Sequence, residues 1–236
     1  MLRLIKAKSY EDMSKKAAAI IAAQVVKKPD CVLGLATGST PIGTYEELVK
    51  MYKDGLLDFS GVSVFNLDEY YGTPITDPNS YYYFMHDNLF NHVNIVEENT
   101  NIPNGMAPDA LAECKAYEAA IKAAGGVDLQ LLGIGPNGHI GFNEPDDVFV
   151  TETQHVKLTD STIDANARFY ASRDEVPTTA LTMGIGTIMK AKSVLLIAAA
   201  NKKDIVEKAV YGPVTPQVPA SVLQYHKDAT FILVEE

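Results

Sequence analysis

The sequence predicts an α/β fold: a single domain built on a mostly parallel sheet, open and doubly wound, with helices on both faces. Three observations support this. Short apolar runs alternate with helical patterns along the chain. The 236 residues contain no repeat and no linker-like segment, so one domain spanning 1–236 is expected. Four of the predicted strands run directly into polar or glycine-rich segments, which is typical of ligand sites in such sheets.

The predicted strands are short apolar runs bounded by polar or glycine-rich residues. They are Leu2–Ala7, Cys31–Leu35, Val62–Leu67, Asp128–Ile134, Thr179–Met183, Ser193–Ala199 and Thr230–Val234. Helical patterns lie between most of them, and a crossover helix joins strands that run in parallel. The expected sheet is therefore of the Rossmann-like kind.

The predicted helices repeat apolar residues on one face and carry start and stop signals. They are Ser9–Lys28, a helix ending at Gly55, Ser80–Asn91, Pro108–Ala124 and Lys202–Tyr211. For the second helix, Thr40 is expected as the N-cap, with Pro41 at the first helical position. Asn201 is expected to cap the last helix, which should end at Gly212.

Composition excludes several classes of protein. The formal net charge is −10 and there is no basic block, which argues against nucleic-acid binding. No apolar run approaches the roughly 20 residues that cross a membrane, and the N-terminus lacks a secretory pattern. Two cysteines, Cys31 and Cys114, are too few for a zinc cluster or a disulfide framework. A cytoplasmic protein without a metal site, nucleic-acid partner or membrane contact is expected.

The segment after the second strand, ATGSTP, has the features of an anion site. Small residues, hydroxyls and free backbone N–H groups lie at an expected helix N-terminus, where the helix dipole favours a phosphate. An acidic chain must supply cations locally, and Lys202, Lys203 and Arg168 are candidates. A simple capped strand-to-helix turn accounts for this segment equally well, and each cation could be an ordinary surface charge.

Two further segments could carry proton chemistry. Asp68 and Glu69 follow a strand, where a partly desolvated carboxylate can act as a base on a carbon acid, although such residues often only cap a loop. The stretch GPNGHIGFNEP places His139 and Glu144 in one glycine-rich loop. Histidine titrates near neutrality, and a nearby carboxylate can orient it. This second constellation favours catalysis over a structural histidine.

Together these segments resemble the glucosamine-6-phosphate deaminase family. The resemblance rests on LATGSTPIGTYEEL, FNLDEYYG, SYYYFM, GIGPNGHIGFNEP, ANARFY and ALTMGIGTI, in order over about Leu33 to Leu233. It implies conversion of glucosamine 6-phosphate and water to fructose 6-phosphate and ammonia, without metal or organic cofactor. The related 6-phosphogluconolactonases share the fold and a Gly-His loop, but DER is expected there in place of DEY. A lactonase or isomerase of this fold, or a non-catalytic sugar-phosphate sensor, are the alternatives.

The resemblance also implies roles for residues. Asp68 matches the base that moves a proton between C2 and C1. His139 matches the acid/base that opens the pyranose ring, and Glu144 the group paired with it. Asn137 stands where well-known members have Asp, so Glu144 is expected to stabilise the imidazolium, while the Asn137 amide could bond the ring. The residues that match the phosphate site are Gly38, Ser39, Thr40, Arg168 and Lys202.

The resemblance finally bears on assembly. Regulated members are longer hexamers that bind an activating sugar phosphate through basic residues after NEP and a C-terminal extension. Here Gln154 and Val156 occupy those basic positions, Asp146 and Asp147 would repel a phosphate, and the chain ends at FILVEE. A monomer or small homo-oligomer without this activation is expected, and a hexamer is not.

Overall fold

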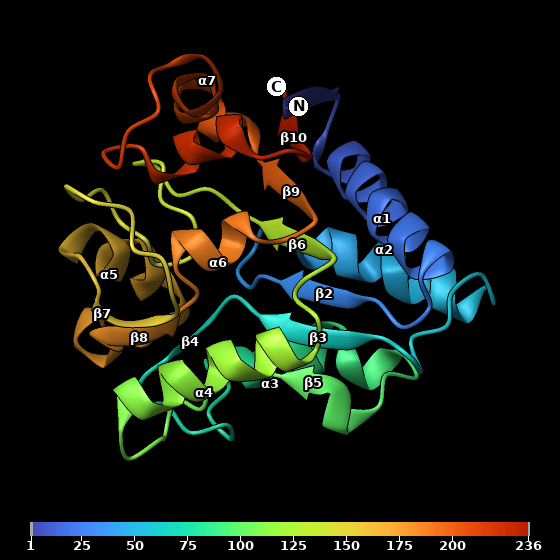
Figure 1. Ribbon diagram of the computed structural model, residues 1–236, viewed down its shortest axis with the longest axis horizontal. Helices are drawn as coiled ribbons and strands as arrows, with labels where there is room; N and C mark the ends of the chain where they lie inside the picture. The colour runs from blue at the N-terminus through green and yellow to red at the C-terminus, as the bar shows by residue number, and fades with distance from the viewer. Residues whose placement is uncertain (1, 236) are drawn as a thin grey trace.

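The computed structural model describes residues 2–235, and its centre is a sheet of seven parallel strands in the order β1-β10-β9-β6-β2-β3-β5 (Figure 1). In that order the strands are Leu2–Ala7, Ala229–Val234, Ser193–Ala198, Leu129–Leu132, Val32–Leu35, Ser63–Asn66 and Thr100–Asn101. The strands β2, β3 and β5 progress toward one edge, and β6, β9 and β10 toward the other. The order therefore reverses between β2 and β6, the point where such sheets bind ligands.

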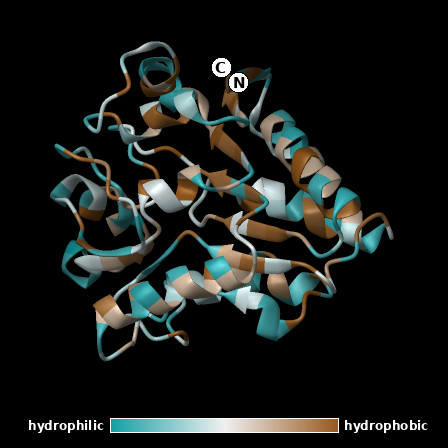
Figure 2. Ribbon diagram, viewed as in Figure 1, coloured by the Kyte–Doolittle hydropathy of each residue, from teal (hydrophilic) through white to brown (hydrophobic). Residues whose placement is uncertain are grey.

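Helices cover both faces of this sheet, as predicted. They are α1 (Tyr10–Lys27), α2 (Ile42–Lys53), α3 (Tyr81–Asn88), α4 (Ala110–Ala123), α6 (Ile185–Met189) and α7 (Lys203–Tyr211). One further helix, α5 (Asp160–Asn166), packs apart from this sheet, in a smaller apolar cluster. Apolar side chains of α1, α2 and α3 pack with one face of the sheet, and those of α4, α6 and α7 with the other. In β10, Phe231 and Leu233 face the second layer while Ile232 and Val234 face the first. A strand buried on both faces is apolar throughout, which explains the brown strands of Figure 2.

A second sheet was not expected. Its antiparallel strands, in the order β4-β8-β7, are Asp68–Tyr70, Thr179–Thr182 and Gln154–Lys157. The predicted strand Thr179–Met183 is present as β8, but it belongs to this second sheet. Asp68 and Glu69, expected to follow a strand, come after β3 and also begin β4. The short elements β5, β7, α5 and α6 have too few residues to show a period and were not predicted.

Two predicted helix caps were also wrong. The second helix begins at Ile42, so Thr40 and Pro41 stay in the preceding loop, and no side chain of that loop caps it. Instead the backbone N–H of Gly43 donates to Tyr10 Oη at 2.9 Å, a contact from α1. A 3₁₀ turn at Ala200–Lys202 precedes α7, and Asn201 makes no capping bond. Gly212 does terminate α7, and Gly55, just beyond α2, has a φ of 73°.

Candidate active site

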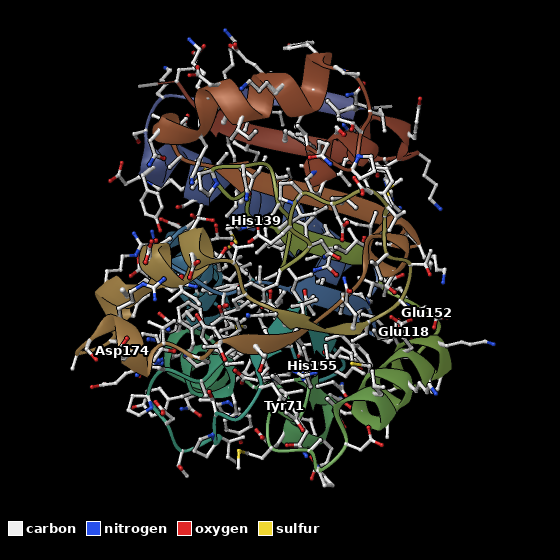
Figure 3. The ribbon with its side chains drawn as sticks, turned by 90° about the vertical axis from the view of Figure 1, so that its left-hand side faces the viewer. Tyr71, Glu118, His139, Glu152, His155 and Asp174 are labelled. Atoms are coloured by element: carbon white, nitrogen blue, oxygen red, sulfur yellow. The ribbon has the colours of Figure 1, made fainter. Side chains whose placement is uncertain are left out.

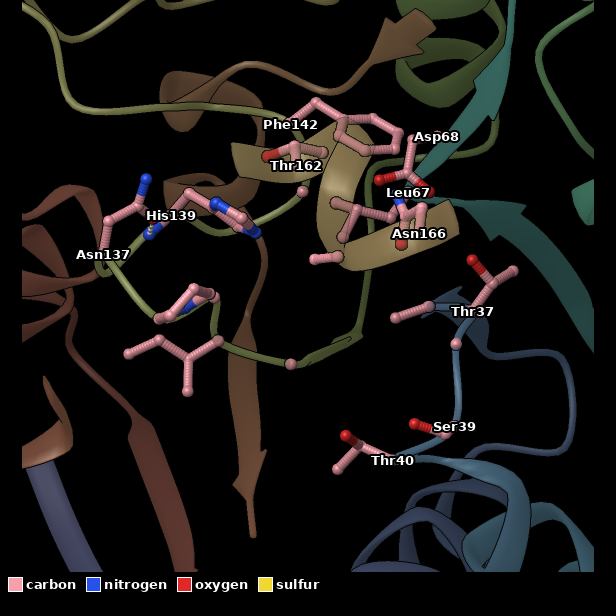
Figure 4. A pocket seen from close by; sticks show the side chains of 18 of the residues that line it. Thr37, Ser39, Thr40, Leu67, Asp68, Asn137, His139, Phe142, Thr162 and Asn166 are labelled. Atoms are coloured by element: carbon pink, nitrogen blue, oxygen red, sulfur yellow. Dashed lines mark hydrogen bonds between the residues drawn. The ribbon is translucent and has the colours of Figure 1, made fainter. Parts of the chain in front are cut away.

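The four strand ends singled out in the sequence converge on one cavity of about 230 Å³. It lies beyond the carboxyl ends of β2, β3, β6 and β9, as predicted, and α5 and the 3₁₀ turn after it complete the wall. Figure 4 shows His139, Asp68 and Ser39 bordering the space from different sides. The residues that match the family's catalytic and phosphate sites all line this cavity except Glu144, which lies directly behind His139. The other two candidates, Glu69 and Lys203, do not line it.

One end of the cavity brings hydroxyl groups and two cations together. Gly38 has a φ of 96°, a left-handed conformation that side chains avoid, and it turns the loop so that Ser39 and Thr40 line the cavity. From the 3₁₀ turn after α5, Arg168 Nη2 donates to Ser39 Oγ at 3.4 Å. Burial lowers the pKa of Lys202, and the charge of Arg168 lowers it further. Neither cation forms an ion pair with a carboxylate of residues 2–235, so an incoming anion would relieve their repulsion.

Asp68 faces the cavity from the start of β4 and is buried. Burial raises the pKa of Asp68 well above its ordinary value, and the charge of Glu69 acts in the same direction. No hydrogen bond to this carboxylate comes from another of the residues that the structure describes. A desolvated carboxylate without donors is a stronger proton acceptor than one in water.

Glu69 lies in different surroundings from Asp68, so the two adjacent carboxylates do not act as a pair. Its oxygens accept backbone N–H bonds of Tyr70 at 2.8 Å, Tyr81 at 2.9 Å and Tyr82 at 2.9 Å. Burial nevertheless raises the pKa of Glu69 to about 7 against the effect of these bonds. Because Tyr81 and Tyr82 open α3, Glu69 supports the N-terminus of that helix and does not line the cavity.

His139 and Glu144 meet as predicted. The His139 Nδ1 atom lies 3.1 Å from Glu144 Oε1, which leaves Nε2 for a substrate. A Cβ built on Gly135 would come within 2.2 Å of the imidazole, so a glycine is required where the ring packs on the backbone. Burial acts to raise the pKa of Glu144, but the neighbouring His139, followed by the Thr162 hydroxyl and the Asn137 amide, lowers it to about 2.

Asn137 acts on the carboxylate. Its Nδ2 donates to Glu144 Oε2 at 2.6 Å, and its Oδ1 accepts the backbone N–H of His139 at 3.2 Å. The Asn137 amide, which the sequence analysis considered as a partner of the imidazole ring, therefore bonds to Glu144 and not to the ring.

Sequence reasoning missed several residues of the cavity wall, among them Tyr81, Thr162 and Asn166. Thr162 and Asn166 belong to α5, whose seven residues are too few to carry an apolar period. Asn166 stands within the ANARFY segment, which was the one signal pointing to this wall. Within residues 2–235, no cluster of His, Cys, Asp or Glu is arranged to hold a metal ion, and none of the helices is long and apolar enough to cross a membrane.

Comparison with known proteins agrees with this architecture. A sequence model described as glucosamine-6-phosphate isomerases/6-phosphogluconolactonase matches residues 6–232. A glucosamine-6-phosphate deaminase of Clostridioides difficile (strain 630) is 59% identical over 100% of this chain and 94% of its own length. One of Lachnoclostridium phytofermentans is 61% identical, covering 98% of each chain.

Solved structures give the same answer for the fold. The structure of a monomeric glucosamine-6-phosphate deaminase superposes with a TM-score of 0.97 at 44% identity, covering 99% of this chain and 98% of the other. A 6-phosphogluconolactonase from Thermotoga maritima, 18% identical over 99% of both chains, shares the fold with a TM-score of 0.76. By its family match and its close full-length relatives, this chain belongs to the family of glucosamine-6-phosphate isomerases and 6-phosphogluconolactonases.

Proposed function

We propose that this chain is a glucosamine-6-phosphate deaminase, which converts glucosamine 6-phosphate and water into fructose 6-phosphate and ammonia. The observation that carries the proposal is the composition of one cavity, where an anion site, a desolvated carboxylate and a histidine–carboxylate pair face a common space. The relatives at 59% and 61% identity, matched over almost their whole length, bear the same name.

The anion site holds the phosphate of the sugar. The Arg168 and Lys202 side chains contact its oxygens from one side, and the hydroxyls of Ser39 and Thr40 and the backbone at Gly38 from the other. This group does not react, so its binding energy is available to orient the sugar and to favour the open chain.

Ring opening belongs to His139. Its Nε2 takes the proton of the anomeric hydroxyl and delivers one to the ring oxygen O5 as the C1–O5 bond breaks, which leaves an aldehyde at C1. Glu144 at Nδ1 fixes the ring and stabilises the imidazolium that forms between the two proton transfers. Asn137 holds the second oxygen of that carboxylate.

Isomerisation belongs to Asp68. Its carboxylate removes the proton of C2, and the aldehyde oxygen O1 takes a proton from the C2 ammonium group of the substrate, which gives an enolamine. The Asp68 carboxyl then returns its proton to C1, which leaves a hydroxyl on C1 and an iminium at C2. Water then adds to C2 and ammonia leaves, so that the C2 ketone of fructose 6-phosphate remains. The raised pKa of the buried Asp68 carboxyl suits proton abstraction from carbon. No step requires a metal ion or an organic cofactor.

The deaminase activity is assigned to residues 1–236 as one cytoplasmic domain, acting as a monomer or small homo-oligomer without a nucleic-acid or membrane partner. The similar solved structure is that of a monomeric enzyme. Gln154, at a position where regulated members carry a basic group, is tied to Asn143 by a 3.0 Å hydrogen bond.

A coupled assay tests the proposed activity. The purified protein is supplied with glucosamine 6-phosphate, and fructose 6-phosphate and ammonia are measured in parallel, with equal yields expected. Hydrolysis of 6-phosphogluconolactone without ammonia from the amino sugar would assign the cavity to the other activity of the family.

A further inference from the structure

The Glu144 carboxylate is held by more groups than the histidine it serves. Its Oε2 accepts from Asn137, while its Oε1 accepts from the hydroxyl of Thr162 and, at 3.3 Å, from the hydroxyl of Thr159. The same Oε1 is the atom that lies 3.1 Å from His139 Nδ1. One oxygen therefore has both a threonine from α5 and the imidazole as partners.

The imidazole has little freedom to follow a displaced carboxylate. His139 packs so closely on Gly135 that even a Cβ there would overlap three ring atoms, and its side chain is only 18% exposed. Although Nδ1 is within ion-pair distance of Glu144, it is not aligned with any acceptor as a hydrogen bond in the described residues. The orientation of the Glu144 carboxylate thus decides whether the pair can form a good hydrogen bond when the ring is protonated.

We propose that Thr162 is a positioning residue for ring opening, because its hydroxyl holds Glu144 Oε1 against His139 Nδ1. Thr162 is 4% exposed and lies in the first turn of α5, where the capping hydroxyl of Thr159 accepts its backbone N–H at 3.3 Å. The hydroxyl therefore comes from an element separate in sequence from the loop that carries both His139 and Glu144. Thr162 and His139 lie on the same side of the cavity in Figure 4.

This inference rests on the proposed deaminase function, and its experiment separates the two. The variant is Thr162→Val, which keeps the approximate size of the side chain and replaces its hydroxyl by a methyl group. Turnover of glucosamine 6-phosphate should fall about tenfold to a hundredfold, as expected for losing a hydrogen bond to a charged group. KM and competitive inhibition by inorganic phosphate should change less than about threefold, since Arg168 and Lys202 are untouched.

Two further comparisons exclude a merely structural role. Thr162→Ser restores the hydroxyl and should recover turnover to within about threefold of the unmodified enzyme. The 4,5-dideoxy analogue of the substrate lacks the oxygens that close a ring, so its deamination should be almost insensitive to Thr162→Val. Equal losses on both substrates, or a rise of KM with unchanged turnover, would overturn the proposal.

Thr153→Val is the matched control. Thr153 also donates its hydroxyl to a glutamate, Glu118, at 2.7 Å, but Glu118 lies apart from His139 in Figure 3 and neither residue lines the cavity. Its kinetics should equal those of the unmodified enzyme.

A crystal structure of Thr162→Val gives a readout independent of activity. Glu144 Oε1 should have left its position 3.1 Å from His139 Nδ1. An unmoved Glu144 would refute the role of Thr162, whatever the reaction. Absence of ammonia release by the unmodified protein would instead refute the deaminase function.

Discussion

Replacing Lys202 by alanine tests whether Lys202 and Arg168 together bind the phosphate of the substrate. Lys202 is partly buried beside Arg168, and both effects lower its pKa. A charge-assisted hydrogen bond to a phosphate contributes about 1.5–3 kcal/mol. Losing one should therefore raise KM by about tenfold to 150-fold while turnover changes far less, because the phosphate is remote from C1 and C2.

The measurement is the initial rate of ammonia release at varied substrate, with inorganic phosphate as a competitive inhibitor. In the unmodified enzyme, phosphate binding should weaken as pH rises through the lowered pKa of Lys202, because the cation is lost; the variant should lack this alkaline loss. Lys203→Ala, the exposed neighbour outside the cavity, is the control. The assignment is refuted if both lysine variants behave alike, or if Lys202→Ala leaves KM unchanged.

Other predictions concern the chemistry and its regulation. Asp68→Asn keeps the shape of the side chain but removes its basicity, so turnover and C2–H exchange with solvent should both fall at least about a hundredfold while phosphate still binds; near-normal turnover would contradict the role of base. His139→Gln should slow the cyclic substrate far more than the 4,5-dideoxy analogue, and equal losses would indicate a structural histidine. Substrate kinetics should be hyperbolic and unaffected by N-acetylglucosamine 6-phosphate, from a monomer or small oligomer in sedimentation; a sigmoidal response that this compound straightens, from a hexamer, would overturn the expectation.

Much of the cavity could be predicted because its parts are encoded locally. Each of the four contributing strands is a short apolar run followed at once by its polar segment, so the strand ends could be located and their meeting at one edge inferred. The pairing of His139 with Glu144 was also predictable, since only a short glycine-rich turn separates them.

Other features depend on contacts between distant segments. Asp68 and Glu69 read alike in the sequence, yet pairing of β4 with β8 turns Asp68 toward the cavity, and Glu69 is taken up by the N-terminus of α3. The first turn of α2 is completed by Tyr10 of α1 and not by Thr40. In both cases the local sequence is compatible with more than one hydrogen-bond partner, and contacts with a distant segment determine which one is used.

By itself, the sequence determined the α/β class, the strands buried on both faces and the loops that follow them, because burial and turn chemistry act over a few neighbouring residues. Only the tertiary structure decided the strand order, the second antiparallel sheet and the placement of Thr162 against Glu144. These features depend on which distant segments pack together. The free energy of that packing comes from contacts between segments, so it cannot be read from any one short stretch of sequence.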